Sequence, residues 1–331
     1  MPPAGGATVE DLVRAMLDLM PPPGFWDQFL TVRYLRPTAR LCARRGASGL
    51  AGELIAAIAR TGPRIAASAE TALILARAGR TDEARAVFAV AREHADPDYA
   101  GPDYADPHSR VVPWEPEEAA VVEAALGGAF EALGDRARAD LWFSRARESA
   151  LPETAPSENR FALLWALLES GRTDDEIRAL WRSGPWDDAR TWGVHLGRTR
   201  RRDLYEEFLT AWEAECEKTG GRAREEFALA VSVVRLTVDH LGPVAAFPAP
   251  RTPSRSDIAD LNAEYESLPK VPGEERECST ELLIETAARR GHLAAVLHLV
   301  PELPQAAPFS RFAVVSRALR TAIESRCERP W

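Results

Sequence analysis

Apolar residues near the start of the chain recur with the spacing of one face of an α-helix. They follow each other at intervals of three and four residues: Val9, Leu12, Val13, Met16, Leu17 and Met20. Thr8 is placed to cap this helix, and the acids Glu10 and Asp11 suit the positive end of its dipole. Alanine- and leucine-rich segments follow, separated by short breaks at Gly46, Gly79, Gly134, Gly171, Gly197 and Gly291. No alternation of apolar and polar residues with period two is sustained, so the sequence predicts an all-α fold.

The glycine breaks allow the helical segments to be aligned with one another. Around one break, the small and aromatic positions are Leu126, Gly127, Phe130, Gly134, Ala139, Phe143 and Ala146. Around another they are Ala72, Leu75, Gly79, Ala84, Phe88, Ala91 and Pro97. Both segments resemble tetratricopeptide repeats, in which each unit of about 34 residues is a helix–turn–helix. Small residues let the two helices of a unit approach closely, and the aromatic side chain fills the gap against the next unit.

Weaker copies of the same pattern flank these two segments, at residues 32–64, 157–186 and 187–217. The last needs about two extra residues after Gly197 to stay in phase with the template. The resemblance therefore covers roughly residues 32–217, and it implies a right-handed α-solenoid of antiparallel helix pairs. Other arrays of helix pairs are the alternative, because the motif consists of degenerate small and large positions.

Breaks in composition suggest where the parts of the chain begin and end. The spacing from Gly79 to Gly134 is longer than one repeat unit. The additional residues are rich in proline, glycine and aspartate, which is typical of an exposed insertion. The predicted organisation is a capping helix with a proline-rich turn at 1–31, a repeat domain at 32–241 with the insertion at 96–116, a proline-rich linker at 242–257 and further helices at 258–331.

Charge and cysteine content exclude several classes of protein. The chain has 331 residues, with 41 basic and 50 acidic side chains, so its net charge is −9. This argues against a protein that coats nucleic acid or an anionic membrane. No apolar window is long enough to span a bilayer and no signal peptide is apparent, so a cytoplasmic location is expected. The four cysteines lie far apart without a CxxC motif, which is typical of reduced thiols rather than of a zinc or redox site.

The sequence contains no recognisable catalytic motif. Neither HExxH nor a nucleotide-binding or nucleophile-elbow glycine pattern occurs. The acids Asp174, Asp175 and Glu176 follow Thr173 and fit the first turn of a capped helix better than a metal site, because Arg178 occupies the position one turn after Asp175. We therefore expect no enzyme activity, no metal and no cofactor.

The family resemblance also implies a binding surface. In tetratricopeptide proteins the first helices of successive pairs line a concave groove that holds an extended peptide or a partner's helix. Pro37 favours a helix that begins close to Arg36, because proline is tolerated in the first turn of a helix. The positions in this chain that match the groove and are expected to bind a partner are Arg36, Arg40, Arg44, Arg77, Phe161 and Trp165. Trp114 is added to this set because the proline-rich insertion offers little to bury it.

Such a groove is basic at one end and apolar further on. It suits an acidic segment or a carboxylate at a chain terminus joined to hydrophobic anchors. The expected function is therefore that of a non-catalytic scaffold that binds a protein or peptide. Two alternatives stay open at this point: an α-helical enzyme with a metal- or diphosphate-binding pocket near 160–240, and a regulatory protein that senses a peptide.

Overall fold

The computed structural model describes residues 8–20, 34–95, 114–152, 155, 157–182, 189–198, 201–219, 227, 231, 277–289, 291–303 and 308–325. In that part of the chain every regular element is a helix, so the prediction of an all-α fold is confirmed. The helices form two compact units, one made of Met1–Ala59 with Pro243–Trp331 and the other of Arg60–Gly242. We call them the terminal unit and the central unit.

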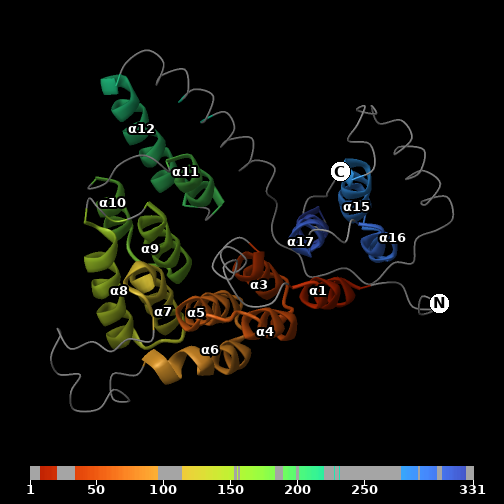
Figure 1. Cartoon of the computed structure of the whole chain (residues 1–331). Helices are drawn as coiled ribbons and strands as arrows, with labels where there is room; N and C mark the ends of the chain where they lie inside the picture. The colour runs from red at the N-terminus through yellow and green to blue at the C-terminus, as the bar shows by residue number, and fades with distance from the viewer. Residues whose placement is uncertain are drawn as a thin grey trace. The chain divides into compact units, whose positions relative to one another are not determined.

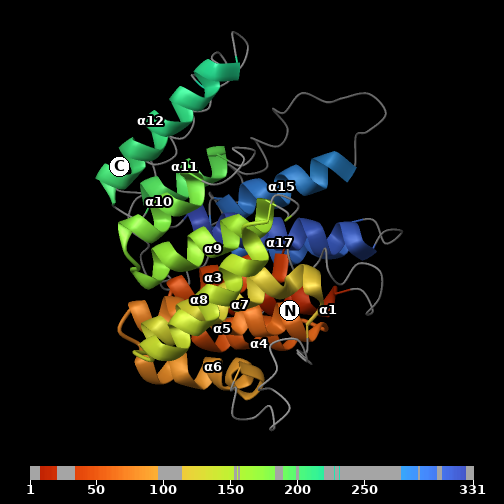
Figure 2. The ribbon, with the colours of Figure 1, turned by 90° about the vertical axis from the view of Figure 1, so that its left-hand side faces the viewer.

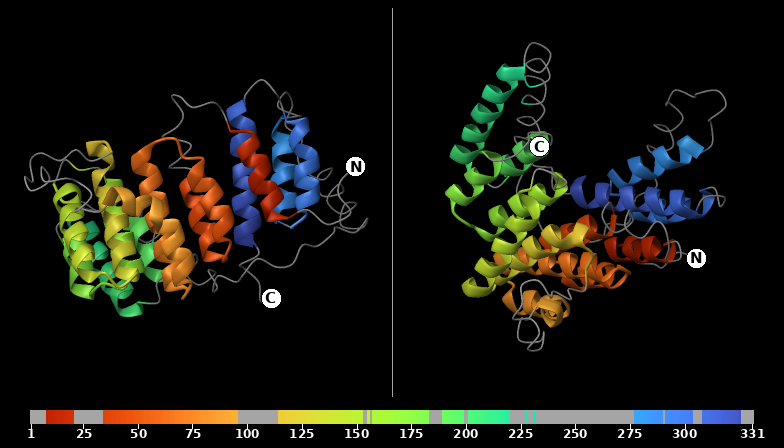
Figure 3. Two further views of the ribbon diagram at one scale, coloured as in Figure 1. Left: turned by 90° about the horizontal axis from the view of Figure 1, so that it is seen from below. Right: turned by 60° about the vertical axis from the view of Figure 1, so that its left-hand side comes forward.

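The terminal unit is built from both ends of the chain. Its helices are α1 (Val9–Asp18), α3 (Arg36–Arg44), α4 (Ser48–Ala56), α15 (Glu277–Arg289), α16 (Leu293–Leu299), the short 3-10 helix η4 (Val300–Glu302) and α17 (Pro308–Ser325). Figure 3 shows α1 alongside the C-terminal helices, and α17 packs on α1, α3 and α15. The rings of Tyr34 and Phe312 meet edge to face with their centroids 5.5 Å apart. The α3/α4 hairpin, which the sequence analysis placed in the repeat domain, thus shares a core with the C-terminal helices.

The central unit consists of consecutive helix pairs (Figures 1 and 2). Its elements are α5 (Thr61–Arg77), α6 (Thr81–Ala95), η3 (Pro116–Glu118), α7 (Ala119–Ala132), α8 (Arg136–Ala150), α9 (Ser157–Ser170), α10 (Asp174–Arg182), α11 (Ala189–Arg198) and α12 (Arg202–Thr219). We call α5, α7 and α9 the first helices of their pairs, and α6, α8 and α10 the second helices. Each first helix packs against its own second helix, and α7 also packs against both α5 and α9.

Five of the turns inside helix pairs share one geometry. In each of these five, a glycine with positive φ ends the first helix: Gly46, Gly79, Gly134, Gly171 and Gly291. In every case its amide donates to the carbonyl three residues earlier, and the next amide donates to the carbonyl five residues before itself. At Gly134, for example, these bonds reach Glu131 and Phe130 at 3.0 and 2.9 Å. This Schellman arrangement satisfies the last carbonyls of the helix and needs a residue without the Cβ penalty.

The sixth predicted break, at Gly197, lies within one residue of the end of a helix. Gly197 is the last residue but one of α11, and α12 begins at Arg202. Residues 199 and 200 lie outside the described residues. Gly197 keeps the helical backbone, so it does not form the left-handed turn of the other five glycines.

The turn geometry makes a prediction for Gly134, whose φ is +87° and whose Cβ position faces open space. With no clash to add to the backbone strain, Gly134→Ala should destabilise the protein by about 1–2 kcal/mol. Gly134→Asn should cost clearly less, because asparagine tolerates the left-handed conformation. Urea denaturation followed by circular dichroism measures both variants. If the alanine variant is as stable as the original protein, glycine is not required in this turn and the prediction is wrong.

Candidate functional site

Three of the predicted binding residues form a stripe on α3. The helix begins at Arg36, with proline in its first turn, and carries no acidic residue. Arg36, Arg40 and Arg44 are spaced by four residues, so they lie on one face at a rise of about 6 Å per step. All three are half-buried. We call these three residues the arginine stripe.

The opposite face of α3 holds the stripe in place. Its side chains are small and buried: Thr38, Ala39, Cys42 and Ala43. The Thr38 hydroxyl donates to the Tyr34 carbonyl at 2.6 Å, within the turn that precedes the helix. Burial raises the pKa of the Cys42 thiol to about 12, so it stays protonated and unreactive at neutral pH. The stripe is therefore the chemically distinctive face of this helix.

Arg77 lies at the end of α5 in the central unit and is exposed. Its guanidinium donates to the Glu169 carbonyl near the end of α9. That carbonyl belongs to the last turn of a helix, where acceptors lack partners within the helix. Arg77 therefore caps α9 from another helix pair, a structural role that the sequence analysis did not foresee.

The other predicted groove positions are mostly buried. Trp165 is 4% exposed and Phe161 is half-buried. Leu73 of α5 is fully buried. A Cβ on Gly128 of α7 would lie 2.9 Å from Leu73 Cδ2 and 3.6 Å from the Cβ of Ala166. The first helices α5 and α9 thus meet across α7. The prediction that Trp165 lines an open groove was wrong, because the neighbouring helices close over this face.

Trp114 is also buried, at 6% exposure, so the reason for which it was chosen does not hold. Its ring lies 6.0 Å, centroid to centroid, from that of Trp142 on α8. A Cβ on Gly62 would lie 2.6 Å from the Trp114 Cβ, so the absence of a side chain at Gly62 makes room for the tryptophan. Residues 96–113 of the predicted insertion lie outside the described residues.

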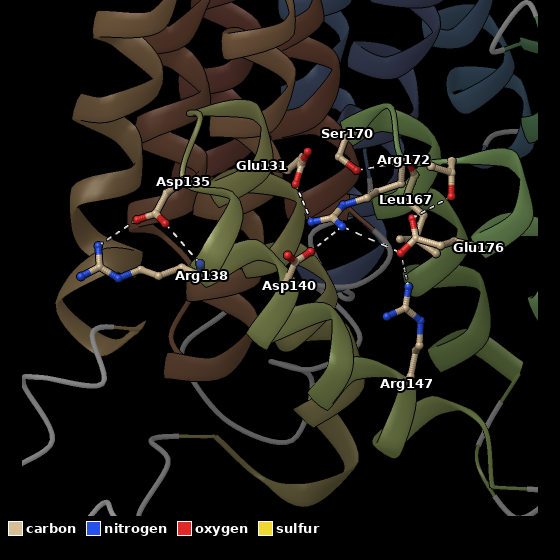
Figure 4. Close-up of polar contacts among 10 residues, drawn as sticks. Glu131, Asp135, Arg138, Asp140, Arg147, Leu167, Ser170, Arg172 and Glu176 are labelled. Carbon is tan, nitrogen blue, oxygen red and sulfur yellow. Dashed lines mark hydrogen bonds and ion pairs between the residues drawn. The ribbon is translucent and has the colours of Figure 1, made fainter.

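A charged group with three acidic neighbours is one that sequence analysis missed. Arg172 follows the turn glycine of the α9/α10 pair, and its side chain is only 7% exposed. Its guanidinium pairs with Glu131 of α7 and Asp140 of α8 (Figure 4). It also lies 3.8 Å from a carboxylate oxygen of Glu176 on α10, and 5.0 Å from the centroid of the Phe143 ring.

The charge of Arg172 is stabilised by these neighbours. Burial by itself lowers the pKa of the guanidinium, but its hydrogen bond to Asp140 and the nearby charges of Glu131 and Glu176 outweigh burial and raise the pKa. Arg147 of α8 donates to Glu176 at 2.7 Å, which joins a second guanidinium to the same network. The network therefore ties the α7/α8 pair to the α9/α10 pair.

Further ion pairs continue toward the last helices of the central unit. Arg178 of α10 makes two hydrogen bonds to Glu207 of α12, at 2.6 and 2.9 Å. These bonds raise the pKa of the Arg178 guanidinium. Arg201, just before α12, donates to the Arg172 carbonyl and to Asp174 at 2.9 and 3.0 Å. Charged side chains thus connect three successive helix pairs.

The acids considered as metal ligands have structural roles. Asp174, Asp175 and Glu176 form the first turn of α10, where their charges suit the helix dipole, as predicted. Each is also paired with an arginine. Among the described residues no group of three or more histidine, cysteine or acidic side chains is arranged to hold a metal ion. Nor does any helix in the described part of the chain have the length and apolarity needed to cross a membrane.

Comparison with known proteins adds no identification. No family model matches the chain, and neither a curated protein nor a solved structure matches it.

Proposed function

We propose that the chain is a non-catalytic, tetratricopeptide-like scaffold that binds an acidic protein segment through the arginine stripe of α3. The observation that carries this proposal is the stripe itself: three half-buried arginines at successive helical turns, on a helix that contains no acid. Carboxylates pair with arginine through strong, charge-assisted hydrogen bonds. An acidic helix or extended segment, including one that ends in a free carboxylate, matches this spacing.

The helix-pair organisation supports the scaffold part of the proposal. The five shared turns and the packing of α7 between α5 and α9 are what a solenoid of helical hairpins requires. Helical repeat surfaces commonly serve to bind other proteins. In the central unit the apolar position Trp165, which was expected to line the groove, is buried. The proposed binding site is therefore the arginine stripe of the terminal unit.

The test is a peptide-binding measurement on the full chain. The probe is a fluorescein-labelled peptide of alternating glutamate and leucine with a free C-terminal carboxylate, and its binding is followed by fluorescence anisotropy. Arg40→Gln with Arg44→Gln should weaken binding about tenfold, since two surface guanidinium–carboxylate contacts are worth about 1.4 kcal/mol together. A peptide with glutamine in place of glutamate should bind weakly to the original protein.

The matched control is Arg85→Gln with Arg92→Gln on α6, both exposed. This pair changes the net charge by the same amount but leaves the arginine stripe intact. If both double variants weaken binding equally, attraction is a general effect of net charge and the proposed site is wrong.

A further inference from the structure

Residues 114–118, which lead into α7, dock on the beginning of α5. Gly62, in the first turn of α5, has no side chain, and a Cβ there would overlap the Glu118 carboxylate and lie 2.6 Å from the Trp114 Cβ. The Trp114 ring is buried and lies 6.0 Å, centroid to centroid, from that of Trp142 on α8. We call residues 114–118 the docking segment. It fixes the start of α7 against both α5 and α8.

Glu118 is the charged group at the centre of this contact, and its side chain is only 11% exposed. An Arg60 nitrogen lies 2.8 Å from one carboxylate oxygen, Oε1, but outside hydrogen-bonding geometry, so that oxygen is buried without a hydrogen bond. The other oxygen, Oε2, accepts from the Glu115 amide at 3.3 Å. The docked carboxylate has therefore exchanged most of its water for one neighbouring cation and one long hydrogen bond.

The environment of Glu118 favours its neutral form. Burial raises the pKa of the Glu118 carboxyl, because it penalises the ionised form. The Arg60 charge and the Glu115 amide lower this pKa, while the charges of Glu115 and Glu117 raise it. Burial outweighs the favourable contacts, so the net direction is upward. When the segment undocks, Glu118 returns to water and to an ordinary pKa. Protonation of Glu118 therefore favours the docked state.

We propose that the docking segment is a pH-dependent latch that holds more firmly when Glu118 is protonated than when it is ionised. The latch tightens as the pH falls from neutral through the pKa of docked Glu118, and the gain is complete below the ordinary glutamate value of 4.5. A latch closed mainly by the ion pair of Arg60 and Glu118 would respond in the opposite direction. This inference concerns contacts within the central unit and does not depend on the arginine stripe.

Hydrogen exchange of the full chain at pH 4.5, 5.5 and 7.0, followed by mass spectrometry, measures the opening of the latch. The amides of Glu118 and Ala119 donate to the Glu115 and Pro116 carbonyls, so they are protected while η3 is intact. Their protection factors compare the observed rate with that of an unfolded chain at the same pH, which removes the direct effect of pH on exchange. Protection should rise from pH 7.0 to pH 4.5, by up to tenfold for each pKa unit between docked and undocked Glu118.

Three variants assign the response to Glu118. Glu118→Gln keeps the shape of the neutral side chain, so its protection should be high at pH 7.0 and should not change with pH. Arg60→Gln removes the cation that favours ionised Glu118, so it should lose more protection between pH 4.5 and 7.0 than the original protein does. Glu117→Gln is the matched control in the same segment, since Glu117 is exposed. It removes the same charge and should keep most of the pH response.

Circular dichroism at each pH checks that the helices are intact in every variant. The proposal is overturned if the original protein, with its helices intact, loses protection on acidification or shows no dependence on pH. It is equally overturned if Glu118→Gln still responds to pH, or if this variant is less protected than the original protein at pH 7.0, because the ion pair would then be what closes the latch. These comparisons decide the matter even if Arg60→Gln does not fold.

Discussion

Replacing Arg172 by methionine should destabilise the protein by about 3 kcal/mol, the lower end of the cost of breaking a buried ion pair. The substitution keeps a long apolar side chain but leaves Glu131, Asp140 and Glu176 without their common cation. Asp140 is 57% exposed and recovers hydration easily, whereas Glu131 and Glu176 are less than one-third exposed. The contact of the guanidinium with the Phe143 ring is lost as well. Urea denaturation of the full chain, followed by circular dichroism, measures the change.

The control for this prediction is Arg85→Met on α6. Arg85 pairs with Asp82 in an exposed i, i+3 arrangement, with side-chain exposures of 64% and 98%. Such surface pairs contribute less than about 1 kcal/mol, so this variant should be close to the original protein in stability. If Arg172→Met and Arg85→Met behave alike, the network around Arg172 contributes no more than an ordinary surface pair, and its assigned role in joining the helix pairs is wrong.

The local parts of the fold could be predicted from the sequence because their causes are local. A glycine that ends an apolar helical pattern marks a turn, and Gly79 and Gly134 do so in the structure. At Gly197 the same logic found the end of a helix to within one residue but not the turn conformation, since Gly197 keeps the helical backbone. The position of a helix end is a local property, whereas the backbone conformation of its last residues also depends on what they pack against.

Burial of the candidate site could not be predicted for a related reason. An apolar residue on a first helix, such as Trp165, fits both an open groove and a closed contact between neighbouring helices. The choice depends on how closely α5 and α9 approach each other across α7. Gly128 of α7 and Ala166 of α9 are small enough to allow a close approach, and they belong to two different helix pairs. Likewise, Trp114 looked exposed from its proline-rich surroundings, but the space that buries it is provided by Gly62, far away in the sequence.

The charge network was missed because each of its members has a simpler local explanation. Arg172 resembles the cations that gather where helices end, and Glu176 resembles an ordinary cap at a helix start. The signal that could have revealed the network is the spacing of 29 residues between an arginine and a glutamate, which occurs between α8 and α10 and again between α10 and α12. Such a spacing becomes meaningful only once the helix pairs are aligned.

Gly127→Ala should destabilise the protein by about 1–2 kcal/mol. A Cβ at this position would lie 2.9 Å from two atoms of the Phe143 ring, which is fully buried and cannot move aside freely. Overpacking of this kind costs about 1–3 kcal/mol, and the better helix propensity of alanine returns up to about 1 kcal/mol. The neighbouring Gly128→Ala meets the end of the Leu73 side chain, which is also fully buried, at 2.9 Å, but a methyl group shifts more easily than an aromatic ring. Its cost should therefore be smaller than that of Gly127→Ala.

A double-mutant cycle separates the ring contact from other effects of the substitution. In a Phe143→Leu background the smaller side chain leaves room for the new methyl group, so Gly127→Ala should cost less than it does beside phenylalanine. The difference between the two costs measures the coupling between these positions in the α7/α8 pair. Additive effects of Gly127→Ala and Phe143→Leu would show that the close approach of the two helices does not depend on glycine, contrary to the packing described for this pair.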